Sequence, residues 1–394
     1  MTKPGKRILI LSASAGSGHV IAAHALEKAF KGMPEVAEVR SIDALKYTNR
    51  LFQNFYSKLY TQLVAKAPTF LGWWYKTSDE PWKTDKMRLM LDRLNTAPLI
   101  KLITAFDADI TVCTHFLPAE LISYLIAEKK LQARLSIVVT DLDFHAMWLS
   151  RAFHRYFVAL EETKVHLIKL GLPGDRITVS GIPIDTTFRS HSTEEQRAIR
   201  IGLGLDPVLP VLLVSAGVLG ASPAEIILEE LFDLKVPVQI VLLSGKNMIL
   251  KQELEELGAQ LPSSTIHVKV VGYTTEVSRY MAAATLLIGK PGGLTISEAM
   301  ACGLPMVIIS PIPGQEERNS DQLLEKGMAI KCNDFTTLSY KVEKLLEDPV
   351  RLESMRAKAL ILAHPDAAQV IARTLIEETR RPQPAVELDT TPLA

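Results

Sequence analysis

The sequence has few cysteines, no long apolar run and no excess of either charge. Its three cysteines are widely spaced and form no CxxC pair, which argues against a disulfide framework or a zinc site and favours the cytoplasm. No apolar segment approaches the roughly 20 residues that a membrane-spanning helix needs. The 44 basic and 44 acidic residues balance, so the composition gives no reason to expect a nucleic-acid partner.

The N-terminus also lacks the features of a signal peptide. Residues 1–7 are polar and basic, and the apolar run that follows them, Ile8–Leu11, has only the length of a strand. No small-residue cleavage pattern stands behind that run. We therefore expect that any contact with a membrane is peripheral.

What the chain does have is a long alternation of short apolar runs and helical segments, in 394 residues that suffice for two domains. The runs are continuously apolar rather than alternating, which indicates parallel strands covered by helices on both faces. They form two series and predict two doubly wound, Rossmann-like α/β domains facing each other across a cleft. The predicted strands are 8–12, 36–42, 109–113, 135–140, 156–159 and 177–180 in the first series, and 211–215, 238–243, 267–271, 286–289 and 305–309 in the second.

The linker between the domains is predicted at Gly181–Asp185, which polar residues follow up to Glu195. We expect an N-terminal domain over residues 1–190 and a C-terminal domain over 191–364. A last helix over 365–380 is expected to pack back on the first domain. Residues 381–394, which are rich in proline and poor in apolar side chains, are expected to form a flexible tail.

The segment Leu45–Lys101 interrupts this alternation. It is helical in composition and interleaves aromatic side chains with lysines and arginines. That mixture suits a bilayer interface, where rings lie at headgroup depth and cations meet anionic lipid. Filling of the core between helices is an equally good explanation for each single ring. The segment as a whole is the candidate for the side of the protein that receives an acceptor.

A glycine-containing loop, Ser12–His19, follows the first apolar run. Glycines let the backbone approach a ligand, and the start of the following helix favours anions. A dinucleotide fingerprint would need a third glycine where Ile21 stands. His19 could accept a proton from an acceptor hydroxyl, because the ordinary pKa of imidazole is near 6.5. The alternative is a histidine that caps its own helix.

A second glycine loop, Lys290–Glu298, follows a strand of the second series. Gly292 and Gly293 would expose backbone N–H groups at a helix start, which suits a diphosphate, and Thr295 could add a hydroxyl donor. Glu298 lies one turn further, where its carboxylate could accept hydrogen bonds from a ribose diol. The alternative is a capping box that only starts the helix.

Two more loops carry polar side chains after strands. The loop Pro311–Asn319 is stiffened by two prolines, and its polar residues suit sugar hydroxyls unless it is simply a solvated loop. The stretch Thr140–Trp148 contains Asp141-Leu142-Asp143, a D-x-D pattern that binds metal in some enzymes, but a three-residue match is weak. Asp141 and His145 are better explained as lining the cleft at the carboxyl end of a strand.

Together these stretches resemble the monogalactosyldiacylglycerol synthase and processive diacylglycerol glucosyltransferase family over about residues 7–363. More distantly, they resemble the enzyme that adds N-acetylglucosamine to the lipid-linked peptidoglycan precursor. The chain departs from the family at Val20, where an arginine often follows the histidine, and in its shorter glycine run. The stretches that carry the resemblance are G-S-G-H at 16–19, T-D-L-D-F-H-A-M-W at 140–148, G-I-P-I at 181–184, K-P-G-G-L-T-I-S-E-A-M-A-C-G-L-P at 290–305 and P-G-Q-E-E-R-N at 313–319.

The resemblance implies a GT-B fold, an inverting mechanism and a UDP-hexose donor held by the second domain. It implies that His19 is the base. The implied acceptor-side residues are Gly16, Ser17, Gly18, Asp141, His145 and Trp148. The implied contacts to the donor diphosphate, ribose and base are Gly292, Gly293, Leu294, Thr295, Glu298, Tyr273, Ser215 and Gly217. The implied contacts to the donor sugar are Gln315, Glu316 and Asn319.

The resemblance implies neither a cofactor nor a metal, because helix N-termini and loop N–H groups can stabilise the departing UDP. The implied partners are UDP-glucose or UDP-galactose, a lipid acceptor such as diacylglycerol, and the anionic inner face of the cell membrane. Two alternatives stay open. One is a nucleotide-sugar epimerase with the same double fold, and the other is a protein that binds and senses a nucleotide sugar without turnover.

Overall fold

The computed structural model describes residues 5–14, 17–47, 79, 97–219, 221–261, 265–380 and 384–388. The chain forms two compact units. The first unit contains Met1–Asp185, Pro313–Arg318 and Asp366–Ala394, and the second contains Thr186–Ile312 and Asn319–Pro365. The second unit therefore begins at residue 186 and the chain returns to the first at 366, where the sequence leads us to expect 191 and 365.

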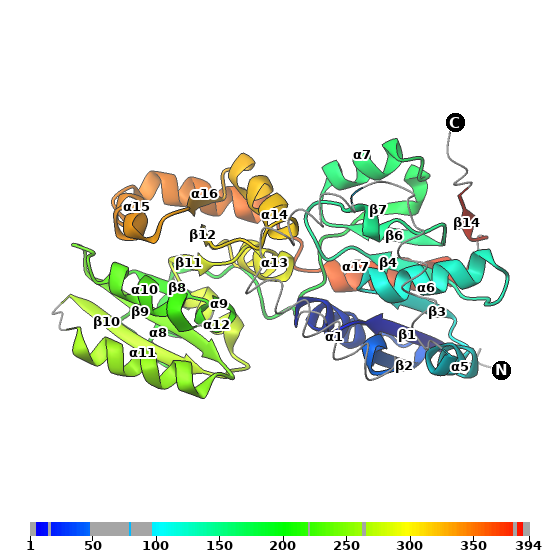
Figure 1. Cartoon of the computed structure of the whole chain (residues 1–394), viewed down its shortest axis with the longest axis horizontal. Coiled ribbons are helices and arrows are strands. Elements are labelled where there is room, and N and C mark those ends of the chain that lie inside the picture. The colour runs from blue at the N-terminus through cyan, green and yellow to red at the C-terminus, as the bar shows by residue number, and fades with distance from the viewer. Residues whose placement is uncertain are drawn as a thin grey trace. The chain divides into compact units, whose positions relative to one another are not determined.

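The first unit is built on a six-stranded, all-parallel sheet in the order β2-β1-β3-β4-β6-β7. Helices cover both faces of the sheet (Figure 1). The strands are β1 (Lys6–Ser12), β2 (Val36–Asp43), β3 (Ile110–Cys113), β4 (Leu135–Val138), β6 (Arg155–Val158) and β7 (Ile177–Val179). The helices that follow them include α1 (Ser17–Lys31), α5 (Ala97–Phe106), α6 (Phe116–Ala127) and α7 (Glu161–Lys169).

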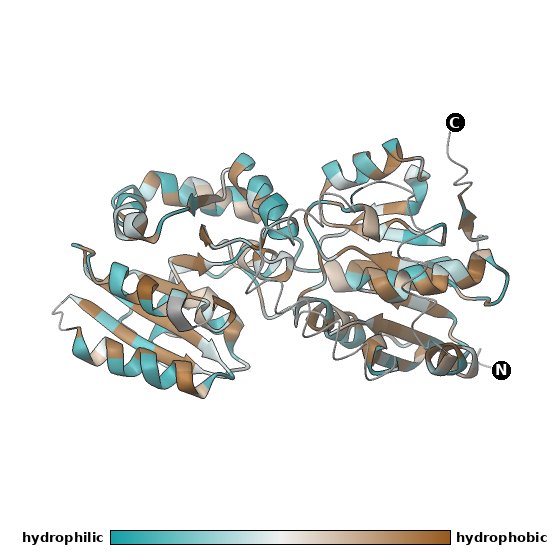
Figure 2. Cartoon of the chain, in the orientation of Figure 1, coloured by the Kyte–Doolittle hydropathy of each residue, from teal (hydrophilic) through white to brown (hydrophobic). Residues whose placement is uncertain are grey.

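Strand β1 shows why the apolar runs are continuous. Successive side chains of a strand point to opposite faces of the sheet. Leu9 and Leu11 join the core beneath α5 and α6, whereas Ile8 and Ile10 join the core beneath α1. Because helices bury both faces, every position of the strand centre is apolar, and the central strands of both sheets are coloured mainly as hydrophobic in Figure 2.

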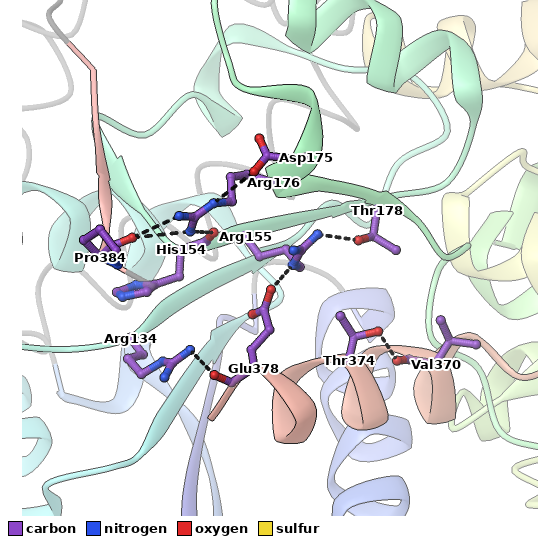
Figure 3. Close-up of polar contacts among 10 residues, drawn as sticks. All are labelled: Arg134, His154, Arg155, Asp175, Arg176, Thr178, Val370, Thr374, Glu378 and Pro384. Atoms are coloured by element: carbon purple, nitrogen blue, oxygen red, sulfur yellow. Dashed lines mark hydrogen bonds and ion pairs between the residues drawn. The ribbon is translucent and has the colours of Figure 1, made fainter. Parts of the chain in front are cut away.

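The C-terminal helix α17 (Ala367–Arg380) completes the first unit by packing beside α1, as the sequence leads us to expect. Its buried face consists of Ala367, Ala368, Ile371, Ala372, Leu375 and Ile376. Glu378 ties the end of the helix to the sheet (Figure 3). The Glu378 carboxylate pairs with Arg155 Nε at 2.5 Å, and Arg134 donates to the Glu378 carbonyl at 3.3 Å.

Part of the expected flexible tail is ordered. Strand β14 (Val386–Glu387) pairs antiparallel with β5 (Ala152–Phe153). Both Nη atoms of Arg176 donate to the Pro384 carbonyl at 3.3 Å (Figure 3). Backbone pairing and an arginine thus hold residues 384–388 of the expected tail against the first unit. Residues 381–383 and 389–394 lie outside the described part of the chain.

The second unit repeats the design with a six-stranded, all-parallel sheet in the order β10-β9-β8-β11-β12-β13. Its strands are β8 (Val211–Val214), β9 (Val238–Gly245), β10 (Ile266–Gly272), β11 (Leu286–Gly289), β12 (Met306–Ile309) and β13 (Ala329–Cys332). Its helices are α8 (Thr193–Gly202), α9 (Ala216–Leu219), α10 (Ala221–Leu231), α11 (Met248–Gln260), α12 (Val277–Ala283), α13 (Gly293–Ala301), α15 (Leu338–Leu346) and α16 (Pro349–Ile361). The helix α14 (Gln315–Glu325) has its first residues in the first unit and the rest in the second.

The prediction of two doubly wound α/β domains is thus confirmed. Across the described residues, no helix combines the length and the apolar character that crossing a membrane requires.

Candidate functional site

The first unit brings its candidate residues together at the point where the strand order of its sheet reverses. Strand β2 lies on one side of β1 and β3 on the other. Doubly wound sheets bind ligands at this position, beyond the carboxyl ends of the strands. His19 follows β1, Thr114 follows β3 and Thr140 follows β4.

His19 lies in the first turn of α1, and its ring contacts residues that follow other strands. The His19 Nδ1 atom is 3.0 Å from the Thr114 carbonyl oxygen and 2.7 Å from Thr140 Oγ1. The Thr114 hydroxyl donates to the His19 carbonyl at 2.9 Å. Burial lowers the pKa of His19 from 6.5 to about 4, although the hydrogen bond with Thr114 raises it. The imidazole is therefore neutral at physiological pH.

Aromatic rings surround His19. The centroid of the His115 ring is 4.5 Å from that of His19, in an edge-on arrangement, and the centroid of the Trp148 ring is 6.4 Å away. Phe116 meets Trp148 edge-on with 6.0 Å between centroids. The His115 Nδ1 atom accepts the Leu117 N–H at 3.0 Å and caps α6. His115 and Phe116 were not predicted as site residues. Their position directly after the carboxyl end of β3 is the feature of the sequence that could have indicated them.

Trp148 is held by the predicted acceptor-side residue Asp141. The indole N–H of Trp148 donates to Asp141 Oδ2 at 3.2 Å, and both side chains are buried. Burial raises the pKa of Asp141 from 3.8 to about 7. The carboxyl group is thus partly protonated near neutral pH and serves to orient the ring.

His145 has a local structural role. Its Nδ1 atom accepts the Met147 N–H at 3.1 Å and caps the short helix Ala146–Trp148. Asp79 is the one described residue between 48 and 96, and it accepts the Ala146 N–H at 2.9 Å. Arg318 pairs with Asp79 and donates to the Phe144 carbonyl at 2.9 Å, so the start of α14 is anchored to the stretch Thr140–Trp148.

The remaining acceptor-side predictions lie at the start of α1. Ser17 and Gly18 form its first turn together with His19. Gly16 lies outside the described residues, as does nearly all of the predicted membrane segment Leu45–Lys101. Neither the contacts of Gly16 nor the role of that segment is tested, and both stay predictions.

The second unit has an equivalent position between β8 and β11, where its strand order reverses. Helix α13 begins there. Its N-cap is Gly292, and no side chain caps it. The capping-box alternative is therefore wrong, because a glycine has no side chain to make the reciprocal bond. The N–H groups of the first turn, which includes Gly293, Leu294 and Thr295, thus carry the partial positive charge of an uncapped helix start, which favours anions.

Ser215 and Asn319 contact residues that directly precede this helix. Ser215 lies against Gly289, where an added Cβ would be 3.3 Å from the Ser215 Cβ. An added Cβ at Gly217 would be only 2.7 Å from the Ser244 carbonyl oxygen, so a side chain does not fit there. Asn319 is buried and donates from Nδ2 to the Pro291 carbonyl at 3.1 Å, which fixes the loop before α13. The Asn319 amide thus makes a structural hydrogen bond within the protein, in addition to any contact that it makes with a ligand.

The other residues predicted to contact the donor lie on three different elements. Glu298 lies one turn into α13 and is buried, which raises its pKa from 4.5 to about 8. Tyr273 follows β10, is 65% exposed, and has the Lys246 ammonium 5.1 Å from its ring centroid. An exposed ring can stack on a base. Gln315 and Glu316 open α14 in the segment assigned to the first unit.

Comparison with known proteins identifies both units. Residues 19–184 match the monogalactosyldiacylglycerol (MGDG) synthase family, and residues 211–371 match the C-terminal domain of glycosyltransferase family 28. A processive diacylglycerol beta-glucosyltransferase of Bacillus pumilus (strain SAFR-032) is 30% identical over 376 residues, with 95% of each chain covered. The enzyme of the same name from Bacillus cereus (strain AH187) is 30% identical over 397 residues, with 94% of each chain covered.

Solved structures match the whole fold. MurG of Acinetobacter baumannii has a TM-score of 0.61 at 17% identity and covers 94% of this chain and 99% of its own. The UDP-GlcNAc 2-epimerase of Neisseria meningitidis, bound to UDP-GlcNAc, has a TM-score of 0.60 at 14% identity, with 94% and 100% covered. At these identities the likeness concerns the fold alone.

The order of the two family matches follows the order of the two units. The two doubly wound units have the GT-B fold, and the family matches make the chain a glycosyltransferase, as the sequence leads us to expect. The chain belongs to the monogalactosyldiacylglycerol synthase and processive diacylglycerol glucosyltransferase family.

Proposed function

We propose that the protein transfers a hexose from UDP-glucose or UDP-galactose to the hydroxyl group of a lipid acceptor such as diacylglycerol, with inversion at the anomeric carbon. The relatives named for diacylglycerol glucosyl transfer support the acceptor, because the likeness spans 95% of the chain. A protein of the same fold, HepE of Anabaena, was solved with UDP-glucose bound, at a TM-score of 0.53. This supports a UDP-hexose donor.

The observation that carries the proposal is the place of His19 at the strand reversal of the first unit, where its ring lies against Thr114 and Thr140 and burial keeps the imidazole neutral. In the proposed step, His19 accepts the proton of the acceptor hydroxyl. The hydroxyl oxygen forms a bond to the anomeric carbon from the face opposite UDP. The bond between that carbon and the β-phosphate oxygen breaks, and UDP leaves with the electron pair.

The second unit supplies the donor side of this proposal. The uncapped start of α13 presents N–H groups and the positive end of the helix dipole to the diphosphate, whose negative charge grows as UDP departs. Gly292 and Gly293 let the phosphates approach the backbone. Glu298 would receive the ribose hydroxyls, and Gln315, Glu316 and Asn319 the hexose. Ser215, Gly217 and Tyr273 would border the nucleotide.

We further propose that the reaction occurs without a metal ion, on the anionic inner face of the cell membrane. The helix N-terminus offers the electrostatic stabilisation that a divalent cation would otherwise supply. All three cysteines are free and buried, which is compatible with a reducing compartment. The lipid acceptor itself requires the protein to reach a membrane.

A transfer assay tests these proposals together. Radiolabelled UDP-glucose and UDP-galactose are each supplied with diacylglycerol in vesicles with and without anionic lipid, in excess chelator. We expect labelled glycolipid from one donor, and a faster rate on anionic vesicles. Release of the sugar without glycolipid would contradict the lipid acceptor, and binding without turnover would contradict an enzyme.

Two histidines on α1 form a matched pair for the base role. His19→Ala should lower kcat about 10²- to 10⁴-fold, which is the usual contribution of a general base. His24 lies on the same helix but is exposed, so His24→Ala should keep the wild-type rate. Wild-type turnover by His19→Ala would exclude this residue as the base.

A further inference from the structure

The two nitrogens of the His19 ring have unequal surroundings. Nδ1 lies 3.0 Å from a backbone carbonyl oxygen, that of Thr114, and 2.7 Å from the hydroxyl oxygen of Thr140. A carbonyl oxygen can only accept a hydrogen bond. If Nδ1 carried a lone pair, that lone pair would face those of the Thr114 carbonyl oxygen at 3.0 Å, so this contact favours a proton on Nδ1, and the Thr140 hydroxyl can then accept.

We propose that Thr114 and Thr140 are positioning residues that hold His19 as its Nδ1-protonated tautomer and leave the lone pair of Nε2 free for the acceptor hydroxyl. This inference rests on the proposed role of His19 as the base. It assigns a function to two threonines that lie 95 and 121 residues away from His19 along the chain.

Thr114 holds His19 at two points. Its carbonyl accepts from the ring, and its hydroxyl donates to the His19 backbone carbonyl at 2.9 Å. Its own N–H donates to the Leu11 carbonyl at 3.0 Å, which locks it to the end of β1. Thr114 thereby fixes both the backbone and the ring of His19 relative to the central strands.

Thr140 sets the rotation of the ring. Its hydroxyl oxygen is the closer of the two acceptors, and it approaches Nδ1 from the end of β4 rather than β3. The Thr114 carbonyl and the Thr140 hydroxyl follow neighbouring strands, and together they fix the plane of the His19 ring more closely than either acceptor alone. Thr114 is 0% exposed and Thr140 is 5% exposed, so water has little access to replace either contact.

The chemistry of this arrangement differs from that of a histidine paired with a carboxylate. Both partners of Nδ1 are uncharged. The Thr114 carbonyl raises the pKa of His19, but burial lowers it by more, so the imidazole is oriented and stays neutral. The low pKa of His19 agrees with this surrounding. The neighbouring His115 uses its Nδ1 as an acceptor, so its proton is on Nε2 and it adds no charge.

A spectrum of the intact protein tests the tautomer directly. The chain is labelled with ¹⁵N at its nine histidines, and a long-range proton–nitrogen correlation reports which ring nitrogen carries the proton. The signal missing from His19→Ala identifies His19. We expect a protonated Nδ1 and an unprotonated Nε2, and a proton on Nε2 would overturn the inference.

Kinetics test the positioning. Thr140→Val removes the hydroxyl at nearly constant volume and should lower kcat about 10- to 100-fold, in line with the cost of misplacing a reacting group, while KM for the UDP-sugar stays unchanged. Thr140→Ser keeps the hydroxyl and should restore most of the rate. Wild-type kcat in Thr140→Val would overturn the role of Thr140.

Two controls separate the possible failures. Thr374 in α17 bonds its hydroxyl to the Val370 carbonyl at 2.8 Å within the same unit (Figure 3), so Thr374→Val should leave kcat and KM unchanged. If Thr140→Val does not fold, Thr140→Ser and the wild-type spectrum still decide the inference. If His19→Ala keeps its activity, the proposal that His19 is the base is wrong. The spectrum of the wild-type protein still decides whether the threonines hold the Nδ1-protonated tautomer.

Discussion

Glu378 in the last turn of α17 pairs with Arg155 of β6 at 2.5 Å, although 223 residues separate them in the sequence. The two side chains are only 21% and 14% exposed. Arg155 also donates to Thr178 Oγ1 at 2.8 Å, so the pair lies inside a hydrogen-bonded group. The C-terminal helix is thereby fastened to the sheet of the unit that begins the chain.

Removing this pair should destabilise the first unit. Glu378→Ala leaves Arg155 largely buried without its carboxylate, and we expect the free energy of unfolding to fall by about 1–3 kcal/mol. Urea denaturation measures this. Arg380, the last residue of α17, forms a more exposed pair with Glu35, which precedes β2, at 2.9 Å, and Glu35→Ala should change little. Equal effects of the two substitutions would contradict a special role for the buried pair.

Gly217 should not tolerate a side chain. In Gly217→Ala the new Cβ would lie 2.7 Å from the Ser244 carbonyl oxygen, so α9 or the end of β9 must shift. We expect a loss of about 1–3 kcal/mol in the free energy of unfolding, and weaker binding of UDP in a calorimetric titration. Gly32 is the control, because its added Cβ would meet nothing closer than 3.5 Å. Unchanged stability of Gly217→Ala would contradict the close contact.

Glu298 should make stability depend on pH. Burial raises its pKa from 4.5 to about 8, so between these values the folded protein keeps a proton that the unfolded chain releases. Its contribution to stability is therefore lost as pH rises from 4.5 towards 8. Glu298→Gln mimics the protonated form and should be close to wild type at pH 5. At higher pH, the free energy of unfolding of Glu298→Gln should exceed that of the wild type, by up to about 1.4 kcal/mol for each pH unit.

Urea denaturation of both proteins at pH 5, 6, 7 and 8 measures this difference. A difference that stays constant over the range would contradict a raised pKa for Glu298. The same variant should bind UDP about 10- to 100-fold more weakly at pH 8 if the carboxylate accepts from the ribose hydroxyls, because such bonds to a charged group contribute about 1.5–3 kcal/mol.

The kcat of the protein should change little in mild acid if His19 is the base. Its pKa is lowered by burial from 6.5 to about 4, so the imidazole stays neutral and able to accept a proton down to about pH 4. We expect kcat at saturating UDP-sugar to lose less than half of its value between pH 7 and pH 5.5. A roughly tenfold loss at pH 5.5, as for an imidazole of ordinary pKa, would contradict this environment.

The strands were predictable wherever both faces of a sheet are buried. The run Leu286–Gly289 is entirely apolar apart from its last glycine, and the predicted strand coincides with β11. Strand β13, Ala329–Cys332, was not predicted, because only two of the four residues of this edge strand are buried and it includes Lys331. Pattern alone also missed β14, whose two residues are held by pairing with β5 rather than by apolar character.

The sequence by itself determined the class of fold, the glycine-containing starts of α1 and α13, and the family, because apolar periodicity and local motifs are properties of neighbouring residues. Only the tertiary structure decided which side chains surround His19. Thr114 and Thr140 reach its ring because β1, β3 and β4 are neighbours in the sheet, and strand order is a long-range property that no local pattern contains. The same holds for the pKa values of His19 and Glu298, since burial depends on what the whole chain packs around each group.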